Sequence, residues 1–90
     1  MLVLPSELTH DQATACLRML VQGLQSQAGP AVVADATALT AFDSSALAVL
    51  LACRREAQAL GKSFAVKGLH ARLGELAALY GVDELLQPAG

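Results

Sequence analysis

The chain has 90 residues, of which 54% are hydrophobic and 3% aromatic, and its formal net charge is −2. This length predicts a single domain over residues 1–90, with a core built from Ala, Val and Leu because larger apolar residues are scarce. A slightly acidic chain with scattered basic residues lacks the cationic field that nucleic acids and anionic membranes require, so neither is an expected partner. No apolar run approaches the roughly 20 residues that span a bilayer, and residues 1–4 lack the basic flank of a signal peptide. We therefore expect a cytoplasmic domain.

The first third of the chain predicts a strand followed by a helix. Leu2–Leu4 is a short apolar run that Pro5 ends. Thr9 and Gln12 have the spacing of a capping box, in which two side chains bond each other's backbone N–H groups at a helix start. Apolar residues then recur at helical spacing, which predicts a helix that ends before Gly29.

Two later segments are typical of strands. Residues 31–36 are a continuous run of small apolar residues without helical period, which favours a central strand buried on at least one face. Asp35 near the end of this run is expected to cap the following turn with its carboxylate. Residues 63–67 alternate, and this pattern predicts that Phe64 and Val66 point inward.

A third helix is expected between Gly68 and Gly81, followed by a closing turn over residues 82–86 and a loose tail over residues 87–90. Strands that alternate with helices through short connections predict an α/β fold with a largely parallel or mixed sheet. The apolar positions of the third helix are Leu69, Leu73, Leu76, Ala77 and Tyr80.

Residues 39–51 are the most informative stretch, because small polar residues lead there directly into an apolar helix. Asp43 and the two serines after it are typical helix-start residues, since their side-chain oxygens accept bonds from unpaired backbone N–H groups. We expect this helix to run from about Ser44 to Leu60. Helical spacing predicts a buried stripe made of Ala46, Val49, Leu50, Cys53, Ala57 and Leu60. The same spacing places Ser44, Ala48, Leu51 and Arg55 on the opposite side, with Leu47 between the two.

Residues that support catalysis or metal binding are few. The sequence has no phosphate-binding loop, no dinucleotide-binding turn and no nucleophile elbow. Asp35 and Asp43 are the best pair of carboxylates, but nothing in the pattern places them in a cleft. Cys16 and Cys53 lie on apolar stripes and are expected to be free and buried. We predict a non-enzymatic protein without a metal site or cofactor.

The segment Phe42-Asp43-Ser44-Ser45, with the residues up to Leu51, resembles the signature of STAS domains, the fold of sulfate transporters and anti-sigma-factor antagonists. Residues 32–35, 66–69 and 76–82 agree with the same family, so the resemblance covers nearly the whole chain. It implies a small mixed sheet in a single layer, flanked by helices. It also implies a strand before Leu2 for which the chain has no residues. The first family strand is therefore expected to be missing, which leaves an exposed sheet edge through which a homodimer could form.

Two branches of this family fit the chain. In the anti-sigma-factor antagonists, a partner kinase phosphorylates the second hydroxyl residue after the aspartate, which is Ser45 here, and the next residue is usually Gly where this chain has Ala46. In the small cytoplasmic STAS subunit of the bacterial phospholipid-transport ABC system, which maintains outer-membrane lipid asymmetry, the important hydroxyl directly follows the aspartate and is Ser44 here. Residues 2–8 and 76–81 also resemble that subunit, which binds the ATPase subunit and supports its assembly and activity. The resemblance therefore favours the lipid-transport subunit, held by its partner at the inner face of the inner membrane.

We predict a protein-binding surface for an ABC transporter ATPase at the start of the central helix. An alternative is a switch in which an anti-sigma-factor kinase phosphorylates Ser45 or Ser44, because a helix N-terminus tolerates the charge of a phosphate. A third hypothesis is a small-ligand sensor with an apolar pocket under the helix. The predicted partner-binding residues are Asp43, Ser44, Ser45, Leu47, Ala48 and Leu51.

Overall fold

The computed structural model describes residues 1–86 and residue 88, and it shows an α/β fold. The helices are α1 (His10–Ser26), α2 (Ser45–Ala59), α3 (Ala71–Leu79) and the short 3-10 helix η1 (Asp83–Leu85). The strands are β1 (Leu2–Val3), β2 (Glu7–Leu8), β3 (Ala31–Asp35), β4 (Ala41–Phe42) and β5 (Ser63–Lys67). The predicted strands and helices are all present. A loose tail was expected over residues 87–90, and of these only Pro88 is among the described residues.

The main sheet has the order β1-β3-β5, and its strands are parallel. Ala34 is paired with Leu2 on one side and with Val66 on the other, so β3 is the central strand, as expected. The pattern of elements predicted a largely parallel or mixed sheet, and the family resemblance implied a mixed one. All strand pairings among residues 1–86 are parallel, however, because each pair of neighbouring strands is joined through a helix that returns the chain to the same end of the sheet.

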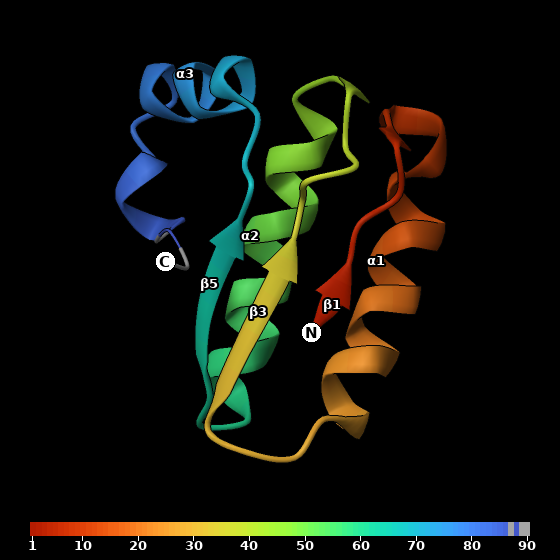
Figure 1. Ribbon diagram of the computed structural model, residues 1–90, viewed down its shortest axis with the longest axis vertical. Helices are drawn as coiled ribbons and strands as arrows, with labels where there is room; N and C mark the ends of the chain where they lie inside the picture. Colours follow the sequence, from red (N-terminus) through yellow and green to blue (C-terminus); the bar gives the residue numbers. More distant parts are fainter. Residues whose placement is uncertain (87, 89–90) are drawn as a thin grey trace.

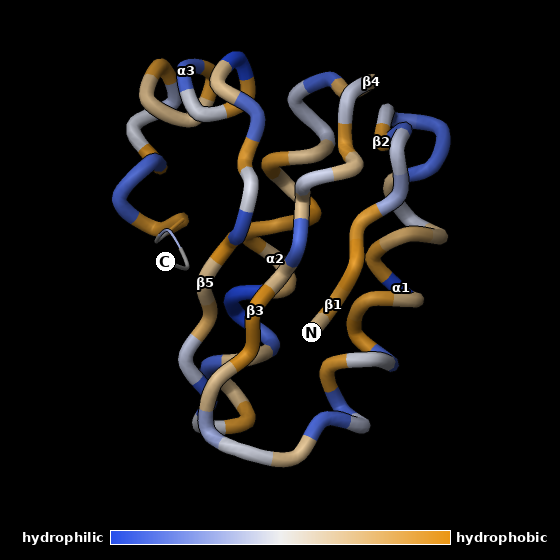
Figure 2. The backbone as a smooth tube through the Cα atoms, viewed as in Figure 1, coloured by the Kyte–Doolittle hydropathy of each residue, from blue (hydrophilic) through white to orange (hydrophobic). Residues whose placement is uncertain are grey.

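Helices α1 and α2 cover one face of this sheet, and no other described element covers the opposite face, which we call the open face (Figure 1). The alternation of the strands follows from this arrangement. Val32 and Ala34 of β3, and Phe64 and Val66 of β5, point toward the helices and are buried. The residues between them are only partly buried or exposed. Figure 2 shows hydrophobic residues along β1 and much of β3, and a hydrophilic residue where β3 and β5 end.

The core consists of small and medium-sized apolar side chains, as the composition predicts. Cys16 of α1 and Cys53 of α2 are free and buried within it. Burial raises the pKa of both thiols, that of Cys53 to about 12. The predicted stripe of α2 is confirmed except for Leu60, which is 48% exposed because the helix has already ended at Ala59. Tyr80, predicted as an apolar core position, is 60% exposed at the end of α3.

A second, two-stranded parallel sheet was not predicted. β2 pairs with β4, and the register places Leu8 opposite Phe42. Each of these strands leads directly into a helix, β2 into α1 and β4 into α2. The pairing therefore brings the N-termini of the two helices side by side, at the end of the molecule where the strands of the main sheet also end (Figure 1). No described helix is long and apolar enough to cross a bilayer.

Candidate functional site on helix α2

The Asp43 carboxylate joins the starts of α1 and α2. Its Oδ1 accepts a hydrogen bond from the Ser45 N–H at 2.8 Å, at the first residue of α2. Its Oδ2 accepts a hydrogen bond from the His10 N–H at 3.0 Å, at the first residue of α1. A carboxylate at a helix N-terminus satisfies N–H groups that have no partner within the helix and interacts favourably with the helix dipole. Asp43, predicted as a partner-binding residue, therefore has a structural role that fixes the two helices relative to each other.

The Asp43 carboxylate is expected to make the free energy of unfolding depend on pH in the acidic range. Hydrogen bonds from Ser45 and His10 hold the pKa of the Asp43 carboxyl below its ordinary value of 3.8. Because the folded-state pKa is the lower one, this stabilisation is complete above the unfolded-state pKa and is lost as pH falls through the folded-state pKa. Asp43→Asn keeps a hydrogen-bond acceptor but loses the charge, so the variant is expected to be less stable than the wild type at neutral pH. This difference in unfolding free energy should shrink below about pH 4, where the wild-type carboxylate also loses its charge. Urea unfolding of both proteins across this range checks the prediction, and a deficit that stays constant down to about pH 3 would contradict it.

The predicted partner-binding residues divide into an exposed group and a buried group. Ser44 and Ala48 are exposed, and Ser45 and Leu51 are half-buried. Leu47, predicted to lie between the buried stripe and the outer side and to bind the partner, is only 2% exposed and therefore belongs to the buried side of α2. α2 packs against α1 as well as against β5, so its buried arc is wider than the single stripe that the spacing predicted. Ser44, Ala48 and Leu51 remain along the outer side of α2, and we call these three residues the α2 ridge.

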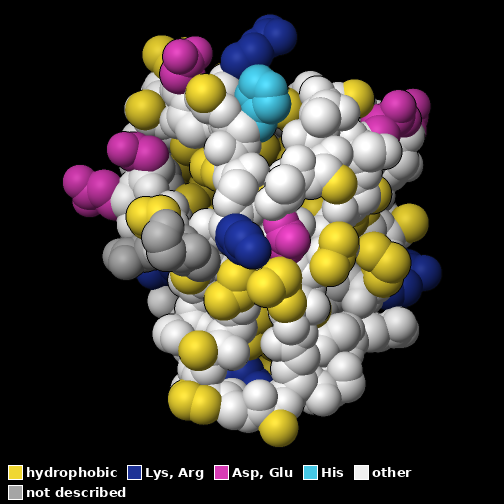
Figure 3. Space-filling view, viewed as in Figure 1, with side chains coloured by type: hydrophobic (Ala, Val, Ile, Leu, Met, Phe, Trp, Pro, Cys, Tyr) yellow, Lys and Arg dark blue, Asp and Glu magenta, His cyan; other side chains and the backbone are white. Residues whose placement is uncertain are grey.

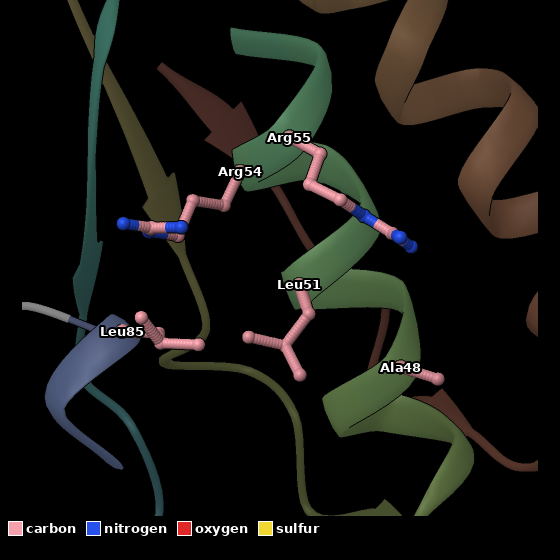
Figure 4. Close-up of a pocket in the computed structure, with 5 residues that line it drawn as sticks. All are labelled: Ala48, Leu51, Arg54, Arg55 and Leu85. Atoms are coloured by element: carbon pink, nitrogen blue, oxygen red, sulfur yellow. The ribbon is translucent and has the colours of Figure 1, made fainter. Parts of the chain in front are cut away.

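Two hollows lie on either side of the α2 ridge. The smaller hollow, of about 140 Å³, lies between α1 and α2, and the larger one, of about 390 Å³, lies between α2 and η1. In Figure 4, Leu51 and Leu85 point toward each other across the larger hollow, whereas Arg54 and Arg55 extend to opposite sides. Ala48 lines both hollows, so the ridge separates them. The smaller hollow is lined by Ala13, Thr14, Leu17, Ala48 and Val49, and the larger by Ala48, Leu51, Arg54, Arg55 and Leu85.

A family model described as "Mlab, STAS domain" matches residues 1–87. The chain belongs to the STAS domain family. No curated protein matches its sequence. STAS domains are in general non-enzymatic modules that bind other proteins, and the protein is a module of this general kind.

Two further polar residues of this STAS domain, Asp35 and His70, bond to the backbone of a turn and of a helix start. The Asp35 carboxylate accepts a hydrogen bond from the Thr37 N–H at 3.0 Å, which confirms the predicted turn cap, and the Thr37 hydrogen bonds lower the pKa of Asp35. His70 Nδ1 accepts from the Arg72 N–H at 3.1 Å at the start of α3, and the His70 ring lies edge-on to Phe42. Asp35 and Asp43 therefore bond to different turns and do not form a pair. Within residues 1–86 and 88, no three His, Cys, Asp or Glu side chains are grouped as metal ligands would be.

The candidate surface on α2 includes residues that the sequence did not identify. Arg54 and Leu85 line the larger hollow, and Thr14 and Leu17 line the smaller one. Helical spacing places Arg55 on the outer side of α2, but the walls contributed by α1 and η1 depend on tertiary packing. The small-ligand hypothesis assumed an apolar pocket under α2. The two hollows beside the ridge instead lie along the outer side of that helix.

Proposed function

We propose that this STAS domain is the subunit that binds and supports the ATPase of a phospholipid-transport ABC complex. The α2 ridge would be its docking surface, and binding would hold the domain at the inner face of the inner membrane. One observation carries the proposal: Ser44 and Ala48 are exposed one helical turn apart, and Ala48 lines a hollow on each side of α2. The description of the matching family model supports this branch of the family.

The ridge suits close packing with a helix of the partner. Small residues at i and i+4 let a second backbone approach closely, because no long side chain separates the two helices. Larger side chains of the partner would then enter the hollows on either side. In the larger hollow, Leu51 and Leu85 supply apolar contact, and the Arg54 and Arg55 guanidinium groups can pair with carboxylates of the partner.

Replacing Ser44 by arginine is expected to abolish the complex without unfolding the domain. Ser44 is exposed, so a long side chain fits in the free protein, but it would fill the space that a close-packed partner needs. The measurement is co-purification of the tagged STAS domain with the transporter ATPase after co-expression. Circular dichroism and thermal unfolding of the isolated variant show that the fold is intact.

Ser26→Arg is the matched control, because Ser26 is an exposed serine at the C-terminal end of α1, whereas Ser44 lies at the end of the molecule where α1 and α2 begin. It introduces the same side chain away from the ridge and is expected to leave capture of the ATPase unchanged. If Ser44→Arg still co-purifies with the ATPase at the wild-type ratio, the docking surface lies elsewhere on the domain. If both variants lose the ATPase, the added charge and not the place of the residue is responsible.

The alternative is phosphorylation by an anti-sigma-factor kinase, and the two serines differ in how they could take part. The Ser45 hydroxyl is half-buried, and the Asp43 carboxylate already accepts the hydrogen bond of the Ser45 N–H, so a phosphate there would meet a like charge. Ser44 is exposed. The geometry therefore favours docking over a switch at Ser45. Incubation with a cognate kinase and ATP, followed by mass measurement, tests the alternative, which requires the added mass of one phosphate.

A further inference from the structure

The open face of the main sheet carries an acid and a base side by side. β3 and β5 are paired so that Asp35 lies opposite Lys67, and Val3 of β1 lies opposite Asp35 on the other side. Residues paired in this way share a face of the sheet, so the three form one row across it. The next row on the same face contains Val33 opposite Ala65. Figure 3 shows hydrophobic side chains around an adjacent acidic and basic group on this face.

This face has no cover within the described residues, although much of it is apolar. Val3 is 62% exposed, and Val33 and Ala65 are only partly buried. Asp35 and Lys67 are charged neighbours, and the Lys67 charge helps to lower the pKa of Asp35, but no ion-pair contact within 4.0 Å joins either of them to a described residue. The Asp35 Oδ1 atom is bonded to Thr37, and Oδ2 has no hydrogen-bond partner among residues 1–86 and 88. A surface that complements this face would be apolar and would carry a base opposite Asp35 and an acid opposite Lys67.

A second copy of the same face meets this requirement. We propose that the protein associates with itself through the open faces of two main sheets, related by a two-fold axis that runs parallel to the strands between β3 and β5. This axis places Asp35 of each copy opposite Lys67 of the other, and it places Val33 opposite Ala65. β1 of each copy then lies beyond β5 of the other, so Val3 lies at the margin of the contact. The two sheets would then pack with their strands nearly aligned, the usual arrangement for stacked sheets. The contact is isologous, as in most homodimers.

The charges select this axis over other two-fold arrangements. An axis along β3 would place Asp35 against Asp35 of the second copy. An axis perpendicular to the strands, through the charged row, would place like charges together at both Asp35 and Lys67. Like charges facing each other oppose association, whereas opposite charges set the register of an interface. The homodimer predicted from the sequence used a sheet edge, and this one uses the face of the sheet, on the side opposite to α1 and α2 (Figure 1).

The dimer is expected to be weak, because a three-stranded face is smaller than the roughly 800 Å² per partner of a stable complex. Sedimentation equilibrium of the wild-type chain, from about 10 µM to about 1 mM, is expected to show the average mass rising from 9.3 kDa toward twice that value. Lys67→Glu places two acids against two acids and is expected to weaken association at least about tenfold. The matched control is Arg72→Glu, the same change of charge on an exposed arginine of α3, and it is expected to associate as the wild type does.

Mixing two variants with opposite charge changes tests whether Asp35 of one copy faces Lys67 of the other, as the proposed axis requires. Lys67→Glu and Asp35→Lys should each fail to self-associate, but an equimolar mixture should form a heterodimer, because every facing pair is then of opposite sign. A wild-type chain that remains monomeric at about 1 mM would overturn the proposal, as would equal weakening by Lys67→Glu and Arg72→Glu. If Asp35→Lys fails to fold because its turn cap is lost, the comparison of Lys67→Glu with Arg72→Glu decides alone. Loss of ATPase binding in Ser44→Arg has no bearing on this result, because the two surfaces lie on opposite sides of the domain.

Discussion

Replacing Gly68 by alanine is expected to lower the free energy of unfolding by about 2–4 kcal/mol, which is a large fraction of the stability of a small domain. Gly68 follows β5 directly and has φ = +69°, a left-handed conformation that is unfavourable for residues with a Cβ. A Cβ at this position would also lie 3.1 Å from the Thr37 Cα atom and overlap the Thr37 side chain. The backbone of this turn is held in place by the Ala36 N–H, which donates to the Lys67 carbonyl at 2.8 Å. The neighbouring turn therefore cannot move away without losing a hydrogen bond.

The variant Gly81→Ala separates the cost of the left-handed backbone conformation from the cost of the contact with Thr37. Gly81 has nearly the same φ, +71°, but no atom lies within 4 Å of the place that a Cβ would occupy. The free energy of unfolding of Gly81→Ala is therefore expected to fall by about 1–2 kcal/mol, the cost of the backbone conformation alone. Urea or thermal unfolding of both variants gives the comparison. Equal losses in the two variants would show that the contact with Thr37 contributes nothing.

Leu47→Ala is expected to destabilise the domain by about 2–5 kcal/mol, the usual range for removing a buried leucine side chain. Leu51→Ala, one helical turn later, is expected to cost only about 0.5–1.5 kcal/mol because its side chain is half-buried. If the α2 ridge binds the ATPase as proposed, the variant that affects stability less should affect ATPase binding more. Leu51→Ala should weaken capture of the ATPase by a folded domain, whereas Leu47→Ala should retain capture at temperatures where the variant is still folded.

This reversal tests the division of α2 into a buried side and an exposed ridge. Unfolding curves and co-purification with the ATPase are measured on the same preparations, with Leu79→Ala as a control. Leu79 is 81% exposed on α3, so its loss is expected to change stability by less than about 0.5 kcal/mol. A folded Leu47→Ala variant that no longer captures the ATPase would return Leu47 to the docking surface.

The elements of the fold could be predicted because the signals that define them are local. The helix start at Thr9 is an example, since Gln12 Oε1 accepts from the Thr9 N–H at 2.9 Å as the capping-box spacing predicts. The turn at Asp35 is another, because its acceptor and donor are two residues apart. The strands at residues 31–35 and 63–67 also follow from their own composition. In each case one short segment contains the whole cause.

The parts that could not be predicted depend on segments far apart in the chain. β2 and β4 are two residues long, too short for any periodic pattern, and their pairing joins residues 7–8 to residues 41–42. The bond from His10 to Asp43 follows from that pairing, so the sequence predicted the helix-start chemistry of Asp43 and a role in partner binding but not the link to α1. Leu47 lies three residues before Leu50, a spacing that permits burial. Only the packing of α2 against both α1 and β5 decides that it is buried.

The two buried thiols allow the opening of this domain to be timed without introducing a new cysteine. Alkylating reagents attack the thiolate, and the pKa of Cys53, about 12, leaves almost none of it at neutral pH even if a reagent could reach the sulfur atom. Cys16 and Cys53 come from two different helices, so labelling of both requires α1 and α2 to separate. The rate of alkylation in native buffer therefore reports how often the helical layer opens.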